Sequence, residues 1–193
     1  TSRGLGDVYK RQLLLMLWGL FKKKVIADRA LPLVEAVFGN QSAYGGAVIV
    51  VGVLFYSLQQ YADFSGGIDL VTGIAQLFGI RLAPYFKRPY FSVSLGDFWR
   101  RWHISLGSWF RDYVYIPLGG NRVSKAKWLR NILVVWMLTG LWHGASWNFV
   151  LWGLGFAVLL VAEKLVYGRL LQRTHVLKHV YTLLPVSYTH LRA

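Results

Sequence analysis

The stretch ILVVWMLTGLWHGASWNFVLWGLGFAVLLVA, residues 132–162, contains no Asp, Glu, Lys or Arg across 31 positions. A single bilayer crossing needs roughly 20 apolar residues, so this run suits one long tilted span or two shorter ones. Its one histidine, His143, is a candidate functional residue because an ionisable group at membrane depth is costly. The simpler interpretation is a buried histidine that hydrogen-bonds to a neighbouring helix. The stretch predicts an all-α membrane protein.

The composition of the whole chain favours the same class. Of its 193 residues, 55% are hydrophobic and 16% are charged, against about 25% charged in soluble domains. The net charge of +14 would suggest nucleic acid in a soluble chain. Here the basic residues lie beside apolar segments, as in membrane proteins, so we expect membrane lipids and no nucleic acid as partners. The absence of cysteine excludes disulfides and thiolate chemistry.

The two ends of the chain match nothing in their surroundings. Residues 1–12 (TSRGLGDVYKRQ) and 187–193 (SYTHLRA) resemble translated sequencing adaptors. Such segments are left out of fold reasoning. The expected membrane domain therefore covers residues 13–186, and we expect it to be an internal piece of a longer protein.

Three further segments predict helices of different kinds. Residues 43–61 carry no charge over 19 positions and predict a transmembrane span that ends at the polar and aromatic residues that follow. Residues 68–80 predict a short or re-entrant helix. Residues 25–38 are short and charged, so we expect an interfacial helix broken near Pro32. The predicted fold is a polytopic membrane helical bundle with interfacial or re-entrant amphipathic helices.

Residues 94–113 predict one amphipathic helix that begins at a capping box. Its apolar residues recur at helical spacing, and Ser94 with Asp97 three positions later is typical of a helix start. His103 lies on the apolar side, where packing is the simpler role. Arg100 and Arg101 lie on the polar side, where they could bind a phosphate, an acidic sugar or lipid headgroups.

The surroundings of His143 predict a narrow polar pocket. On a continuous helix its neighbours are Thr139, Ser146 and Trp147. Gly140 and Gly144 would allow the close approach of another helix or of a substrate. Burial would lower the pKa of the imidazole and keep it neutral, as a general base requires.

A metal site is not expected. His103 and His143 are separated by 39 residues, and the sequence has neither an HExxH motif nor a cysteine pair. Zinc would need a further carboxylate ligand. The serines near these histidines also lack the GxSxG context of an acyl-enzyme nucleophile.

Four motifs taken together resemble one family. They are QYADFSG at 60–66, DFWRRWHISL at 97–106, RDYVYIPLGGNR at 111–122 and GLWHGA at 140–145. Their order and spacing resemble the membrane-bound O-acyltransferase family, in particular its bacterial alginate O-acetyltransferase branch. The resemblance covers residues 13–165, and it departs from the family at Gly67, where an aromatic residue is common. The family's proteins are longer, so it implies a partial catalytic domain.

The resemblance implies a catalytic histidine in a membrane-embedded tunnel. His143 matches that position, and His103 matches the family's second characteristic histidine. On this basis we expect an enzyme, an O-acyltransferase that moves an acetyl group onto hydroxyls of an exopolysaccharide such as alginate, with His143 as general base. Oxyanion stabilisation would come from His103, from a tryptophan N–H or from a basic side chain. The expected substrate-contacting residues are Arg100, Arg101, Trp142, Trp147, Asp63 and Ser146.

The same resemblance sets expectations for ligands and location. The acyl donor would be acetyl-CoA or another acyl thioester, with no bound cofactor. The partners would be the polysaccharide acceptor and other exopolysaccharide acetylation and export proteins, at the bacterial inner membrane in a multi-pass arrangement. Two alternatives remain: a transporter or channel subunit in which His143 relays protons, and a non-catalytic scaffold of a polysaccharide-export complex.

Overall fold

A computed structural model describes residues 5–174 and 178–182, and these residues form helices and turns without a strand. The chain divides into two compact units, Thr1–Ala83 and Pro84–Ala193. The predicted all-α class is therefore confirmed for the described part of the chain. Two described helical segments, Gly46–Leu77 and Trp147–Leu171, are long and apolar enough to cross a membrane by length and composition.

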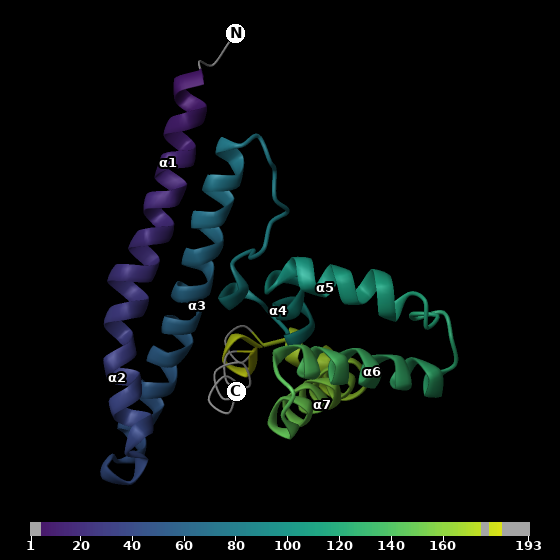
Figure 1. The fold of residues 1–193 in the computed structure, drawn as a ribbon. Helices are drawn as coiled ribbons and strands as arrows, with labels where there is room; N and C mark the ends of the chain where they lie inside the picture. Colours follow the sequence, from purple (N-terminus) through teal and green to yellow (C-terminus); the bar gives the residue numbers. More distant parts are fainter. Residues whose placement is uncertain (1–4, 175–177, 183–193) are drawn as a thin grey trace. The chain divides into compact units, whose positions relative to one another are not determined.

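The first unit is an antiparallel helical pair (Figure 1). Helix α1 (Leu5–Phe21) continues through a π-helical turn, η1 (Lys22–Ala27), into α2 (Asp28–Gly39). After the short 3₁₀ turn η2 (Gln41–Ala43), α3 (Gly46–Leu77) packs back along α1 and α2. A Cβ added to Gly19 would lie 2.6 Å from the carbonyl oxygen of Gly66, so the helices touch through their backbones.

Two predictions about this unit were wrong. The span predicted at residues 43–61 does not end at the polar motif, because α3 runs to Leu77 and includes most of the separate helix predicted at 68–80. The motif stays helical because η1 supplies its partners: Lys22 Nζ donates to Ser65 Oγ at 3.0 Å and Lys23 Nζ lies 2.6 Å from the Asp63 carboxylate.

The predicted break at Pro32 was also wrong. Pro32 lies inside α2, although a proline removes one helical hydrogen bond. Val34 and Val37 lie in the helix beyond Pro32 and are buried, and Val37 packs against Gly52 of α3. Burial of this face holds α2 in helical form beyond the proline.

The second unit carries the two candidate histidines. It comprises the 3₁₀ turn η3 (Pro89–Phe91), α4 (Leu95–Arg101), α5 (Ile104–Phe110), the π-helical turn η4 (Arg111–Tyr115), α6 (Lys125–His143), α7 (Trp147–Ala162), the π-helical turn η5 (Glu163–Tyr167) and α8 (Gly168–Gln172). Residues 178–182 are also helical. The 31-residue apolar run is thus divided between two helices, of which α7 belongs to a segment that is long and apolar enough to cross a membrane.

Helices α6 and α7 cross at glycines. A Cβ on Gly140 would lie 2.3 Å from the carbonyl oxygen of Phe149, and one on Gly153 would lie 2.1 Å from that of Trp136. The close approach predicted for Gly140 is confirmed, and its partner is the helix that follows. This crossing places Trp136 and Trp152 in edge contact, with ring centroids 6.3 Å apart.

Candidate functional site

The helix predicted at residues 94–113 is broken at His103, which was not expected. Helix α4 ends at Arg101, α5 begins at Ile104, and His103 between them has a left-handed backbone with φ of 50°. The cause of the break is another segment of the chain, which hydrogen-bonds to the backbone on both sides of His103: Ile104 N–H donates to the Tyr85 carbonyl and Lys87 N–H donates to the Arg101 carbonyl, both at 2.9 Å. A left-handed non-glycine residue costs about 1 kcal/mol or more, and these bonds hold it in place.

The His103 side chain is buried, with 7% of its surface exposed. Its Nε2 lies 2.7 Å from the hydroxyl of Tyr85, and its ring meets that of Trp142 edge to face at 5.4 Å. Burial is the main cause that lowers the pKa of His103 to about 4; a backbone hydrogen bond partly opposes it, and nearby His143 adds to it. His103 is therefore neutral at pH 7.

His143 differs from the expectation in two ways. It is the last residue of α6, and the chain leaves the helix at Gly144, so Ser146 and Trp147 are not its neighbours on a helical face. Its side chain is also exposed rather than buried. The apolar run turns at this point, which places the imidazole at a helix end and not inside a continuous span. Its ring packs against Trp152 at 4.9 Å.

Both histidines line one cavity of about 550 Å³ within the second unit. His103 enters from the start of α5 and His143 from the end of α6. Trp99, Leu106 and Phe110 line this cavity together with His103, so residues from the apolar side of the predicted helix meet there although the helix is broken. The opposite wall includes Trp136, Thr139 and Trp152 from α6 and α7. Two histidines that are 39 residues apart in sequence thus share one apolar chamber.

The arginines beside His103 are held by Asp97. Arg101 lies 2.9 Å from the Asp97 carboxylate and Arg100 lies 3.7 Å from it. Arg100 also lines the cavity, and its side chain is 73% exposed. Arg100 is therefore the better placed of the two to meet an anionic group at the cavity.

The other predicted site residues are more scattered. The ring of Trp142 contacts both His103 and His143, at 5.4 and 5.1 Å. Trp147 is 79% exposed, and Ser146 accepts a hydrogen bond from Asn148 N–H at the start of α7. Asp63 belongs to the first unit, where it pairs with Lys23.

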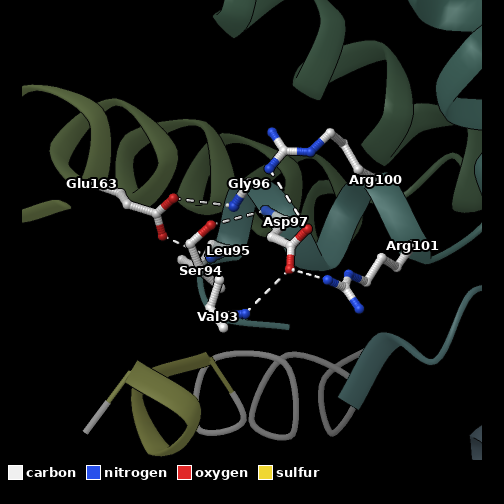
Figure 2. Close-up of polar contacts among 8 residues, drawn as sticks. All are labelled: Val93, Ser94, Leu95, Gly96, Asp97, Arg100, Arg101 and Glu163. Carbon is white, nitrogen blue, oxygen red and sulfur yellow. Dashed lines mark hydrogen bonds and ion pairs between the residues drawn. The ribbon is translucent and has the colours of Figure 1, made fainter. Parts of the chain in front are cut away.

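Glu163 is a structural residue of this site that sequence reasoning did not identify (Figure 2). Its carboxylate accepts hydrogen bonds from Leu95 N–H at 2.7 Å and from Gly96 N–H at 3.1 Å. The predicted capping box is confirmed in one of its two bonds, which is the third at this helix start, from Asp97 N–H to Ser94 Oγ at 3.0 Å, while the Asp97 carboxylate accepts from Val93 N–H at 3.3 Å. The helix start is thus satisfied, and the C-terminal end of α7 is tied to α4. The only sequence signal was a carboxylate at the end of an apolar run.

Among residues 5–174 and 178–182, no group of three histidine, aspartate or glutamate side chains is placed to hold a metal ion. The chemistry that the described cavity can support is proton transfer. An exposed imidazole at its rim can accept a proton from a bound hydroxyl. A neutral, buried imidazole lies in the same wall, and tryptophan rings line the cavity beside both histidines.

Comparison with known proteins identifies similar sequences. Residues 34–187 match the model of the MBOAT, membrane-bound O-acyltransferase family. The chain is 42% identical over 146 residues to "Probable alginate O-acetylase AlgI" of Azotobacter vinelandii, covering 76% of this chain and 29% of that protein. It is 40% identical over 157 residues to a peptidoglycan O-acetyltransferase of Helicobacter pylori, covering 81% and 30%.

A more distant similarity joins it to a teichoic acid D-alanyltransferase of Bacillus subtilis, at 36% identity over 113 residues, covering 54% of this chain and 28% of that protein. The chain thus spans about 30% of the length of the curated relatives that it matches.

Proposed function

The chain belongs to the membrane-bound O-acyltransferase family, and from that premise we propose that it forms part of a membrane enzyme that acetylates hydroxyls of an exported polysaccharide. One observation carries the proposal. The two histidines of the recurring motifs, His103 and His143, line the same cavity of about 550 Å³. A cavity of this size matches the lower part of the range for small-molecule sites.

In the proposed reaction His143 is the general base. Its imidazole takes the proton of the acceptor hydroxyl while the hydroxyl oxygen attacks the carbonyl carbon of an acyl thioester such as acetyl-CoA. The new C–O bond forms and the C–S bond breaks. The thiolate takes the proton from the His143 imidazole and leaves as a thiol. General-base catalysis of this kind contributes about 10²–10⁴-fold. The exposure of His143 beside the cavity supports this role, because a base must reach its substrate.

The negative charge that develops on the carbonyl oxygen needs donors. Trp142 is the candidate best supported by position, because its ring contacts both histidines. Arg100 at the cavity is placed for a charged part of the donor or acceptor. Arg101, Trp147 and Ser146 do not line the cavity, and Asp63 belongs to the first unit; these four residues are proposed only to contact substrate in the complete protein.

The relatives' names also suggest the acceptor and the setting. They include enzymes named for alginate, peptidoglycan and teichoic acid, so a cell-surface polymer is the proposed acceptor, and an alginate-like exopolysaccharide is preferred on the higher identities. We propose a multi-pass protein of the bacterial inner membrane, with lipids and other exopolysaccharide acetylation and export proteins as partners. Two apolar helices that are long enough to span a bilayer support this location.

The test measures O-acetyl content of the polymer in cells that lack their own enzyme. These cells receive the full-length protein that contains this segment, as wild type or as His143→Ala. His179→Gln is the matched control, since this histidine lies in the same unit and its Nδ1 lies 3.0 Å from the Ser92 carbonyl oxygen. Membrane levels of all forms are equalised.

We expect acetylation with the wild type and the control and at least a hundredfold loss with His143→Ala, in line with the contribution of a general base. Full acetylation by His143→Ala would refute the base assignment and favour the scaffold alternative. A wild-type protein that moves protons but never acetylates would favour the transporter alternative.

A further inference from the structure

A short segment before α4 clamps the backbone on both sides of His103. The two bonds that join Tyr85 and Lys87 to Ile104 and Arg101 lie one on each side of the left-handed residue. The clamp brings the ring of Tyr85 to the ring of His103, with centroids 4.4 Å apart and planes inclined by 41°. The position of His103 is therefore set by residues that the four sequence motifs do not include.

The side chains of Tyr85 and His103 also interact directly. The Tyr85 hydroxyl lies 2.7 Å from His103 Nε2, which is a short distance for a hydrogen bond. Burial raises the pKa of Tyr85, so the phenol keeps its proton at neutral pH. Tyr85 therefore presents a hydroxyl group, and not a phenolate, to the imidazole.

The direction of this hydrogen bond follows from its surroundings. A side-chain hydrogen bond with Ser105 lowers the pKa of Tyr85, which is the effect of a bond that the phenol oxygen accepts. Its own proton is then directed at His103 Nε2. A neutral imidazole has one N–H and one lone pair, and His103 is buried and neutral. Nε2 is thus the acceptor, and the imidazole proton is on Nδ1.

We propose that Tyr85 is a positioning residue. Its hydroxyl fixes the ring of His103 in the cavity wall and occupies the Nε2 lone pair of His103 with a hydrogen bond, so His143 is the histidine that acts as base. The inference rests on the proposed function. It also explains why two histidines in one cavity are not equivalent: one is exposed at a helix end, and the other is buried and bonded to a phenol.

A plain packing role for Tyr85 is the competing interpretation. Its ring also meets Phe86 edge to face at 5.2 Å, and a phenylalanine would preserve that contact. Packing alone predicts that Tyr85→Phe leaves both the state of His103 and the reaction unchanged. Positioning predicts changes in both, so this one-atom deletion separates the two interpretations.

The first measurement needs no acetyl transfer. Membranes with the full-length protein are treated with diethylpyrocarbonate, which acylates the lone pair of a neutral imidazole, and the rates at His103 and His143 are read by peptide mass spectrometry. Tyr85→Phe frees Nε2, so labelling of His103 should rise roughly three- to tenfold, the factor that corresponds to one hydrogen bond. His143 should not change, nor should either histidine in the control Tyr113→Phe, which alters an exposed tyrosine. An unchanged rate at His103 would overturn the proposal.

The second measurement is a double-mutant cycle on acetyl transfer. Tyr85→Phe should lower kcat by up to about tenfold with little change in KM, and it should add no loss in a His103→Gln background. Fully additive losses would overturn the proposal, because Tyr85 would then act elsewhere. A wild-type protein without acetyl transfer would refute the proposed function alone, and the labelling rates would still decide whether Tyr85 holds His103.

Discussion

Replacing Glu163 by glutamine tests whether the end of α7 holds the helix that leads to His103 (Figure 2). The carboxylate accepts from two backbone N–H groups, of which that of Leu95 belongs to a fully buried residue. A hydrogen bond to a charged group is worth about 1.5–3 kcal/mol. Glutamine keeps one acceptor oxygen and turns an amide N–H₂ toward the other donor. The expected loss is therefore one such bond, about 1.5–3 kcal/mol.

The assay heats the full-length protein in detergent and follows the fraction that remains monodisperse. For Glu163→Gln we expect the apparent Tm to fall by a few degrees, since 1 kcal/mol corresponds to about 2–4 °C for 150–250 residues and to less in the longer full-length protein. Acetyl transfer should fall as well, because α4 carries Trp99 and Arg100 into the cavity. Glu35→Gln is the matched control, an exposed glutamate of the first unit. If the two variants have the same apparent Tm, the two hydrogen bonds to the Glu163 carboxylate do not contribute the stability assigned to them.

Two further predictions concern pH and the helix crossing. The pKa of His103 is about 4 in the folded protein and about 6.5 in the unfolded protein. Between these pH values the unfolded state binds more protons than the folded state. The free energy of unfolding should therefore be greatest above pH 6.5 and fall as the pH drops toward 4. Unfolding titrations should show a flatter curve for His103→Gln, and identical curves would contradict the shift. Gly153→Ala places a Cβ 2.1 Å from a carbonyl oxygen of α6, whereas Gly155→Ala enters open space. Both variants gain the same helix propensity, so thermal melting should show only Gly153→Ala destabilised, by about 1–3 kcal/mol. Equal Tm values for the two variants would refute the close crossing of α6 and α7.

Much of the fold followed from patterns along the chain. The uncharged stretch at residues 132–162 predicted helices of a membrane protein, and it forms α7 and most of α6. Ser94 and Asp97 predicted a helix start, and Leu95 begins α4. These predictions succeeded because composition and capping act between neighbours in sequence. The prediction that the polar motif ends the first span failed, since its partners Lys22 and Lys23 are about 40 residues away.

The candidate site was also predicted only in part from the sequence. By itself the sequence marked His103 and His143, because histidines among apolar residues are costly and their motifs resemble a known family. Only the tertiary structure decided that they share a cavity, that His143 is exposed and that His103 is buried against Tyr85. The physical reason is that a break in a helix depends on hydrogen bonds from another segment. No local periodicity can report the bonds that turn the backbone at His103.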